Sequence, residues 1–214
     1  MPDTREMKYT CPYCGKEFDI TIYNSVYADV DSDLRDRAVS GDLFRFSCPH
    51  CKTEFLIQYP LVYYDQNHKF VIWLSKKEAS KDLSALVNPL QQSGYILRRC
   101  ETIEEFTEKI QILEDGISDV AVELAKFDSF IEYTENRGGK QEEITSIAYQ
   151  HADDGVLKIN IKANDKGMSF LIPMASLEEE METHKQLFDV EEEKFPLINT
   201  GWIIDLFTQS SGQA

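Results

Sequence analysis

Short runs in which apolar and polar residues alternate fill the first part of the chain. Residues 8–23 and 45–60 each contain two such runs separated by a tight turn, which predicts two β-hairpins. Further strands are predicted at 43–47, 55–64, 70–74 and 95–100. In 103–113 and 118–133 the apolar residues recur every three or four positions, which predicts two amphipathic helices. The chain is therefore expected to begin as a β-rich module and to continue into a helical middle.

Alternating patterns return after about residue 140. Runs at 144–151, 156–162 and 168–174 have the alternation of strands, and turn-forming sequences, Asp153-Asp154-Gly155 and Asn164-Asp165-Lys166-Gly167, separate them. These features predict an antiparallel β-meander. A helix is expected after it, and the apolar residues from Trp202 to Phe207 predict a last short helix or strand.

Capping residues predict where three of the helices begin. Ser32 stands before a helix predicted at 33–40. Two pairs have the spacing of a capping box, Thr102 with Glu105 and Ser176 with Glu179. We therefore expect Ser32, Thr102 and Ser176 to accept hydrogen bonds from the first turns of their helices.

The two predicted hairpins carry copies of one motif, Cys11-Pro12-Tyr13-Cys14 and Cys48-Pro49-His50-Cys51. Shifting 8–23 forward by 37 positions aligns the cysteines and the first prolines, and it also aligns Glu-Phe-x-Ile after each motif. The repeat covers strand, turn and strand, so it is a duplicated structural unit.

Four thiols in two Cys-x-x-Cys pairs can close a tetrahedral shell around one zinc ion. We expect one Zn²⁺, with these ligands: Cys11, Cys14, Cys48 and Cys51. A complete four-thiolate shell has no open position for a substrate, so the metal is expected to be structural. Gly15 supplies the positive φ that the exit of such a turn often needs, whereas Lys52 at the equivalent position is expected to accept some strain or to take a different exit.

The predicted fold class is α+β. It comprises a zinc-ribbon-like β module with two Cys-Pro-x-Cys knuckles, a helical middle, and a C-terminal β-meander with a helix. The glycine-containing segment Asn136 to Lys140 lacks the spacing of a phosphate-binding loop and is interpreted as a flexible link. The expected divisions are 1–75 for the zinc module, 76–136 for the helical segment, and 141–214 for the α+β segment with the meander.

Redox chemistry is an alternative for the cysteines, because Cys-Pro-x-Cys is also an active-site motif of thiol oxidoreductases. In those enzymes a helix follows the motif and lowers the thiol pKa. Here strand-like residues follow both motifs, which favours two half-sites of one metal. Disulfides or another metal, including iron, remain further alternatives.

Composition and charge narrow the function classes. The chain has 214 residues, and its 42% hydrophobic content is enough for a packed core. No N-terminal apolar signal and no apolar run of about 18 residues is present, so we expect a cytoplasmic protein that does not cross a membrane. The net charge of −16 argues against nucleic acid, whose phosphates require cationic partners. A protein partner is expected instead, and basic proteins suit this acidic chain.

Few other residues are candidates for chemistry. His50 lies between two cysteines and could replace one of them as a ligand, but its position favours a side chain that faces solvent. Cys100 is expected to be a small buried residue and not a fifth ligand. No Ser/His/Asp arrangement, P-loop or dinucleotide fingerprint is present.

The chain resembles the CpXC family of prokaryotic proteins. The resemblance rests on the paired C-P-x-C units, Gly41-Asp42-Leu43-Phe44-Arg45-Phe46 before the second pair, Tyr59-Pro60-Leu61 after it, and the stretch from Glu108-Lys109-Ile110 to Glu114-Asp115-Gly116. It implies a zinc-binding domain of unknown function in a bacterial or archaeal cytosolic protein. It carries the four cysteines over as metal ligands and adds no catalytic residue. Lys52 departs from the glycine that the family often has there.

These observations favour a zinc-binding protein whose metal is structural and which serves as a protein-interaction or regulatory module. The alternative is an enzyme, either a thiol-disulfide oxidoreductase that uses the Cys-Pro-x-Cys pairs or a hydrolase with a site in the second half of the chain.

Overall fold

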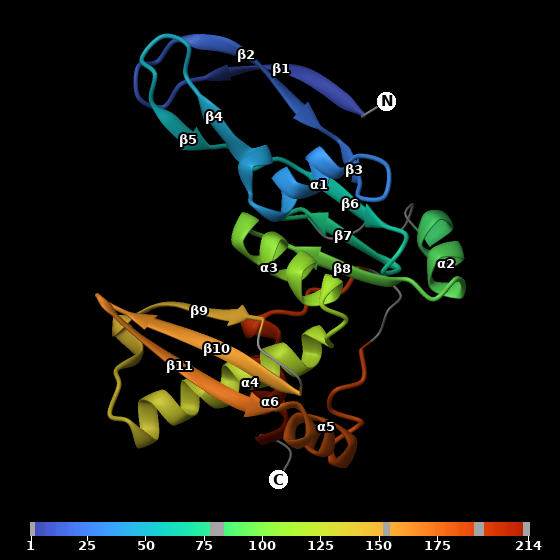
Figure 1. Ribbon diagram of the computed structural model, residues 1–214, viewed down its shortest axis with the longest axis vertical. Helices are drawn as coiled ribbons and strands as arrows, with labels where there is room; N and C mark the ends of the chain where they lie inside the picture. Colours follow the sequence, from blue (N-terminus) through green and yellow to red (C-terminus); the bar gives the residue numbers. More distant parts are fainter. Residues whose placement is uncertain (1–2, 78–83, 152–154, 191–194, 212–214) are drawn as a thin grey trace. The chain divides into compact units, whose positions relative to one another are not determined.

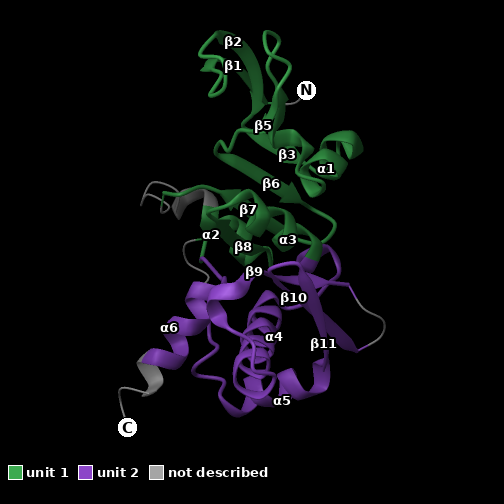
Figure 2. Ribbon diagram, turned by 90° about the vertical axis from the view of Figure 1, so that its left-hand side faces the viewer, with its two compact units in different colours: residues 1–111, 192–196 green, residues 112–191, 197–214 purple. Residues whose placement is uncertain are grey.

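The computed structural model describes residues 3–77, 84–151, 155–190 and 195–211 (Figure 1). The chain forms two compact units, residues 1–111 with 192–196, and residues 112–191 with 197–214 (Figure 2). The expected divisions 1–75, 76–136 and 141–214 stay predictions. The predicted α+β class is confirmed.

Two antiparallel hairpins in the first unit confirm the predicted repeat (Figure 1). Strands β1 (Thr4–Thr10) and β2 (Glu17–Tyr23) form the first hairpin, and β4 (Arg45–Ser47) and β5 (Glu54–Leu56) form the second. Tyr9 lies opposite Phe18 in the first, and Phe46 lies opposite Phe55 in the second. Because equivalent residues pair in both hairpins, the duplication extends to the strand register.

Two predicted strands are shorter than expected. The strand predicted at 43–47 begins only at Arg45, because Asp42–Phe44 forms a 3₁₀ turn, η1, that buries Leu43 and Phe44 in the core. The strand predicted at 55–64 is divided into β5 and β6 (Leu61–Asp65), and Pro60 lies in the break between them.

A mixed four-stranded sheet forms the body of the first unit, in the order β3-β6-β7-β8. Beside β6, this sheet contains β3 (Ser25–Tyr27), β7 (Phe70–Leu74) and β8 (Ile96–Cys100). The pairs β3-β6 and β7-β8 are parallel, and parallel neighbours require crossover connections. Helix α2 (Ser84–Gln92) lies in the crossover from β7 to β8, while α1 (Ser32–Val39) and the second cysteine hairpin lie in the crossover from β3 to β6.

Alternating side chains of this sheet face two apolar layers. Tyr63 is fully buried, and its ring packs edge-on against Phe106 of α3 (Ile103–Glu114). The next residue on the strand, Tyr64, points to the opposite face, where Val71 and Val87 of α2 belong to a second cluster. The sheet is therefore covered by α3 on one face and by α2 on the other.

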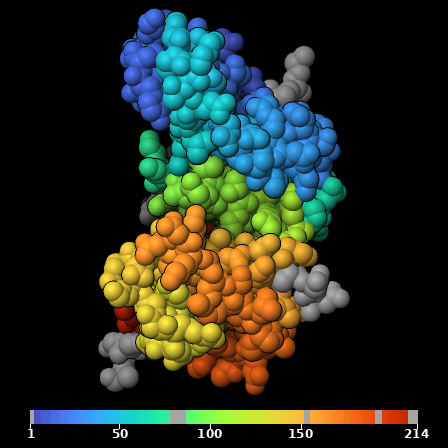
Figure 3. All heavy atoms as spheres, turned by 60° about the vertical axis from the view of Figure 1, so that its left-hand side comes forward, coloured from blue at the N-terminus to red at the C-terminus, as the bar shows by residue number. Residues whose placement is uncertain are grey.

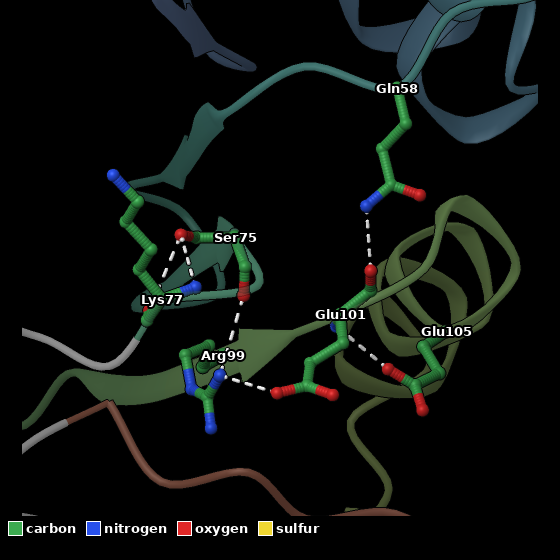
Figure 4. A network of polar contacts seen from close by, with 6 residues as sticks. All are labelled: Gln58, Ser75, Lys77, Arg99, Glu101 and Glu105. Atoms are coloured by element: carbon green, nitrogen blue, oxygen red, sulfur yellow. Dashed lines mark hydrogen bonds and ion pairs between the residues drawn. The ribbon is translucent and has the colours of Figure 1, made fainter.

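A polar network joins the segment after the second hairpin to the start of α3 (Figure 4). Gln58 Nε2 donates to the carbonyl oxygen of Glu101 at 2.6 Å. Arg99 Nη1 donates to Glu101 Oε1 at 2.7 Å, and the Glu101 amide donates to Glu105 Oε2 at 2.8 Å. The junction between β8 and α3 thus anchors the chain leaving the second cysteine hairpin.

Helix capping follows the prediction at one of three sites. Thr102 Oγ1 accepts from the Glu105 amide at 3.1 Å, as predicted. The predicted cap of α1 is wrong by one residue, because Asp31 Oδ1 accepts from the Leu34 amide and Ser32 is already helical. The predicted Ser176 cap is also wrong: α5 (Met174–Thr183) begins after Pro173, so Ser176 lies inside it.

The second unit contains the predicted antiparallel meander, in the order β11-β10-β9. Its strands are β9 (Ile144–Gln150), β10 (Val156–Ala163) and β11 (Lys166–Pro173). The predicted turn at Asp153 and Asp154 lies outside the described residues.

Helices complete the core of the second unit. They are α4 (Asp119–Ile131), a π turn η3 (Glu132–Asn136), a 3₁₀ turn η4 (Gln141–Glu143), α5, and α6 (Thr200–Ser211). Leu124 of α4, Ile159 of β10 and Ile203 of α6 share one buried cluster. Among the described helices, none is both long and apolar enough to cross a membrane.

Candidate metal centre

The turns of the two hairpins bring four sulfur atoms together. Cys11 Sγ lies 3.7 Å from Cys51 Sγ, and Cys14 Sγ lies 3.8 Å from Cys48 Sγ. All four sulfurs lie within 4.8 Å of one another. Zn–S bonds of about 2.3 Å place the sulfurs of a tetrahedral shell about 3.8 Å apart. A disulfide would require a separation of about 2.05 Å, so the cluster has the spacing of a metal site.

The two turns have the same backbone hydrogen bonds. Gly15 N donates to Cys11 O at 2.9 Å, and Lys52 N donates to Cys48 O at 2.9 Å. Both donors have positive φ, 71° at Gly15 and 62° at Lys52. Of the two alternatives for Lys52, the structure shows the same exit with strain, because a side chain at positive φ crowds the backbone.

The cysteines differ in burial in the same way in both motifs. The first cysteine of each motif is buried, with Cys11 1% and Cys48 0% exposed. The second cysteine of each motif is exposed. The cluster thus lies at the surface of the first unit with one side against the protein.

Hydrogen bonds and burial give these thiols unequal acidity. The hydroxyl and amide of Thr53 lower the pKa of Cys51 to about 6. Burial raises the pKa of Cys48, but the amides of Cys51 and His50 outweigh it, so its pKa is lowered overall. The amide of Lys16 lowers the pKa of Cys14, but partial desolvation of its sulfur and contacts with the other thiols raise it to about 11. Binding of a metal would have to displace the proton of Cys14.

Aromatic rings also connect the two hairpins. Phe55 of the second hairpin stacks on Tyr9 of the first at 5.8 Å between centroids, and it contacts the ring of Phe18 at 6.4 Å. Tyr13 lies 6.0 Å from Phe55 and is 65% exposed. The sequence repeat marked Phe18 and Phe55 only as equivalent positions. The sequence analysis did not predict that these two rings contact each other across the hairpins. Aromatic residues at matching positions of the repeat were the one feature that could have indicated this contact.

The cysteine pairs differ in local structure from the active site of thioredoxin-type enzymes, in which a helix follows the motif. Strand β2 follows Cys14 and β5 follows Cys51, so neither motif opens a helix. This confirms the predicted strand context.

The other candidate residues lie apart from the sulfur cluster. His50 is exposed, and its Nε2 is 3.4 Å from Glu17 O. Cys100 is 1% exposed in β8 and is not among the four clustered thiols. Both side chains are therefore placed as the sequence predicted.

The paired hairpins and their four gathered thiols define a class of protein with a tetra-cysteine, metal-site-like cluster on an α+β body. The family model described as CpXC protein matches residues 9–126, which is more than half of the chain, and the protein belongs to that family. The matched region includes all four cysteines and ends within α4, before the meander. No curated protein and no solved structure matches the chain.

Proposed function

We propose that the sulfur cluster binds one Zn²⁺ through Cys11, Cys14, Cys48 and Cys51. The observation that carries the proposal is the mutual approach of four free thiols within 4.8 Å. Thiolates are soft ligands that Zn²⁺ accepts in tetrahedral geometry, and the donor set therefore fits this ion. A zinc ion would neutralise part of the charge of the thiolates and hold the two turns together.

The metal is structural in this proposal. Each cysteine hairpin is a two-stranded sheet, and such hairpins are marginally stable alone. One ion would join residues 11–14 to 48–51, and structural zinc can contribute on the order of 10 kcal/mol to folding. With four protein ligands, no position is left for a bound water or substrate.

The zinc module then serves protein recognition in the cytoplasm. The aromatic surface beside the cluster supports this role, since Tyr13, which lies between two of the cysteines and contacts the Phe55 ring, is 65% exposed. Exposed aromatic residues are frequent anchors of protein interfaces. The net charge of −16 favours a basic protein over nucleic acid.

Elemental analysis and thiol counting on untagged protein test the metal. One zinc per chain is expected. With the metal bound, a thiol reagent should modify at most Cys100, and after denaturation with a chelator it should modify all five cysteines. Cys51→Ser should lose the metal, while Cys100→Ala, the matched control, should retain it. Protein without metal and with two disulfides would contradict the proposal.

A binding comparison tests the recognition role. Tyr13→Ser should keep the full zinc content and lose affinity for a partner that the unaltered protein binds. Equal affinity of both proteins for the partner would show that the aromatic surface around Tyr13 is not the binding surface.

A further inference from the structure

The outer strand of the meander in the second unit has one open edge. β11 pairs with β10 only, in the described sheet order β11-β10-β9. Ala163 and Lys166 close a two-residue turn, and antiparallel pairs alternate between hydrogen-bonded and non-hydrogen-bonded types along the strand. The backbone groups of Gly167, Ser169 and Leu171 therefore point away from β10. An open edge of this length is a template for another strand.

A groove runs along this edge. A cavity of about 460 Å³ is lined by Asp128 and Ser129 of α4 and by residues 169–172 of β11. A second cavity, of about 720 Å³, is lined by Tyr133 and by residues 166–168 of β11. Arg137 lines both cavities, so they adjoin. Figure 3 shows yellow residues, from α4 and the segment after it, beside the orange strands of the meander.

The β11 wall of the groove is apolar. Met168, Phe170 and Ile172 lie on the face of β11 that continues the core, opposite Ile161, Ile159 and Leu157 of β10. The three β10 residues are buried, whereas their partners on β11 are only partly buried. The apolar face of the meander therefore continues into the groove, where further apolar side chains would find a surface to cover.

A half-buried carboxylate in the groove is available to a cation. Glu132 is engaged by Arg137 Nε at 2.9 Å and by Asn136 Nδ2 at 2.6 Å. The half-buried carboxylate of Asp128 has no hydrogen bond or ion pair with any described side chain. A partly buried carboxylate is stabilised by a cation that approaches it.

We propose that an extended, basic segment of a partner protein adds to the open edge of β11 as a fourth strand. Its backbone bonds to the outward groups of Ser169 and its neighbours, its apolar side chains cover Phe170 and Ile172, and a lysine or arginine faces Asp128. This is recognition by β-strand addition, with backbone bonds giving affinity and alternate side chains giving selectivity. The inference rests on the proposed role in protein recognition and identifies a second surface that does not involve the metal.

The probe is the peptide acetyl-Thr-Val-Thr-Lys-Thr-Val-Thr-amide. Its valines and lysine share one strand face, which would enter the groove. Titration into the isotopically labelled full chain should give saturable shifts of the Gly167, Ser169 and Leu171 amides. The peptide with glutamate in place of lysine should bind about tenfold more weakly, as expected for loss of one charged contact near Asp128.

Two substitutions of the chain separate the backbone contact from the charged contact. Ser169→Pro removes an outward N–H, which an edge strand tolerates, and should weaken binding about tenfold, whereas Ser169→Ala should bind as the unaltered protein does. Asp128→Asn should abolish the preference for the lysine peptide over the glutamate peptide.

Peptides with N-methyl groups provide the same backbone test without altering the chain. Methylation on the valines and lysine, or on the threonines, blocks opposite edges of the peptide strand, so only one of the two peptides should lose binding. Absence of saturable shifts at about 1 mM peptide, equal binding of the lysine and glutamate peptides, or equal binding of both methylated peptides would overturn the inference. Zinc content measured on the same samples reports separately on the metal proposal.

Discussion

Lys52 in the second hairpin holds the left-handed backbone conformation that Gly15 holds in the first, with φ of 62° and 71°. The two residues also donate the same hydrogen bond, each to the carbonyl oxygen of the first cysteine of its motif, at 2.9 Å. The turn geometry is therefore conserved between the two copies although the residue is not, and the second copy carries the strain of a side chain at positive φ.

Exchange of these two residue types should have opposite effects on stability. A Cβ at Gly15 would meet no atom within 4 Å, so Gly15→Ala should lower the free energy of unfolding by about 1 kcal/mol through backbone strain alone. Lys52→Gly should raise it by about 0.5 kcal/mol, since relief of strain is partly offset by the greater freedom of glycine in the unfolded chain. Denaturant titration of zinc-loaded protein measures both. If Lys52→Gly lowered the free energy of unfolding, the lysine side chain would contribute more stability than its backbone strain costs.

Removal of the metal should unfold the cysteine hairpins. A chelator, or the variant Cys51→Ser, should lower the melting temperature of the first unit and increase hydrogen exchange of the amides of β1, β2, β4 and β5, because structural zinc contributes on the order of 10 kcal/mol to such modules. Cys100→Ala should keep the response to the chelator, since this thiol lies outside the cluster. Unchanged exchange in the hairpins after complete metal removal would show that the metal is not structural.

The capping difference between Thr102 and Ser176 should be measurable. Thr102 accepts the hydrogen bond of the Glu105 amide, so Thr102→Ala should cost about 1 kcal/mol of stability. Ser176 is exposed and lies inside α5, where its hydroxyl donates to Pro173 O, so Ser176→Ala should change stability by less than about 0.5 kcal/mol. Thermal unfolding of the two variants compares them directly. Equal losses would indicate that Ser176 contributes to the start of α5 after all.

Asp128 should make stability depend on pH. Burial first, and then the charge of Glu180, raise the pKa of Asp128 from 3.8 to about 6. The folded protein thus binds this proton more tightly than the unfolded chain, so the ionised carboxylate destabilises the fold above about pH 6 and the cost disappears below about pH 4. Asp128→Asn should stabilise the protein at pH 8 by about 1 kcal/mol, allowing for the screening of a partly exposed group, and should have no such effect at pH 4.

The matched control for this pH effect is Asp205→Asn, which removes one exposed carboxylate of α6 and changes the net charge equally. Denaturation midpoints at several pH values measure both variants. If both variants gained the same stability at pH 8, the effect would come from the overall charge of −16 and not from the surroundings of Asp128.

Several parts of the fold follow from local patterns in the sequence. Alternating patterns located the three strands of the meander, because a strand with one buried face imposes a period of two. A continuous apolar run located β7, which is buried on both faces. The helical period located α3 and α4, and Thr102 marked the start of α3. Capping at Asp31 was missed because two adjacent residues, Asp31 and Ser32, can both cap, and only the folded backbone shows that Asp31 holds the extended conformation of a cap.

The sequence by itself determined which residues gather at the candidate metal centre, since a repeated Cys-Pro-x-Cys hairpin encodes its own turn and the direction of its thiols. Only the tertiary structure decided that Cys11 lies beside Cys51 and Cys14 beside Cys48, that β3 runs parallel to β6, and that β11 has no second partner strand among the described residues. The physical reason is the range of the interactions. Turn chemistry and hydrophobic period act over a few residues, whereas the pairing of distant strands and hairpins depends on which apolar faces cover one another in the folded chain.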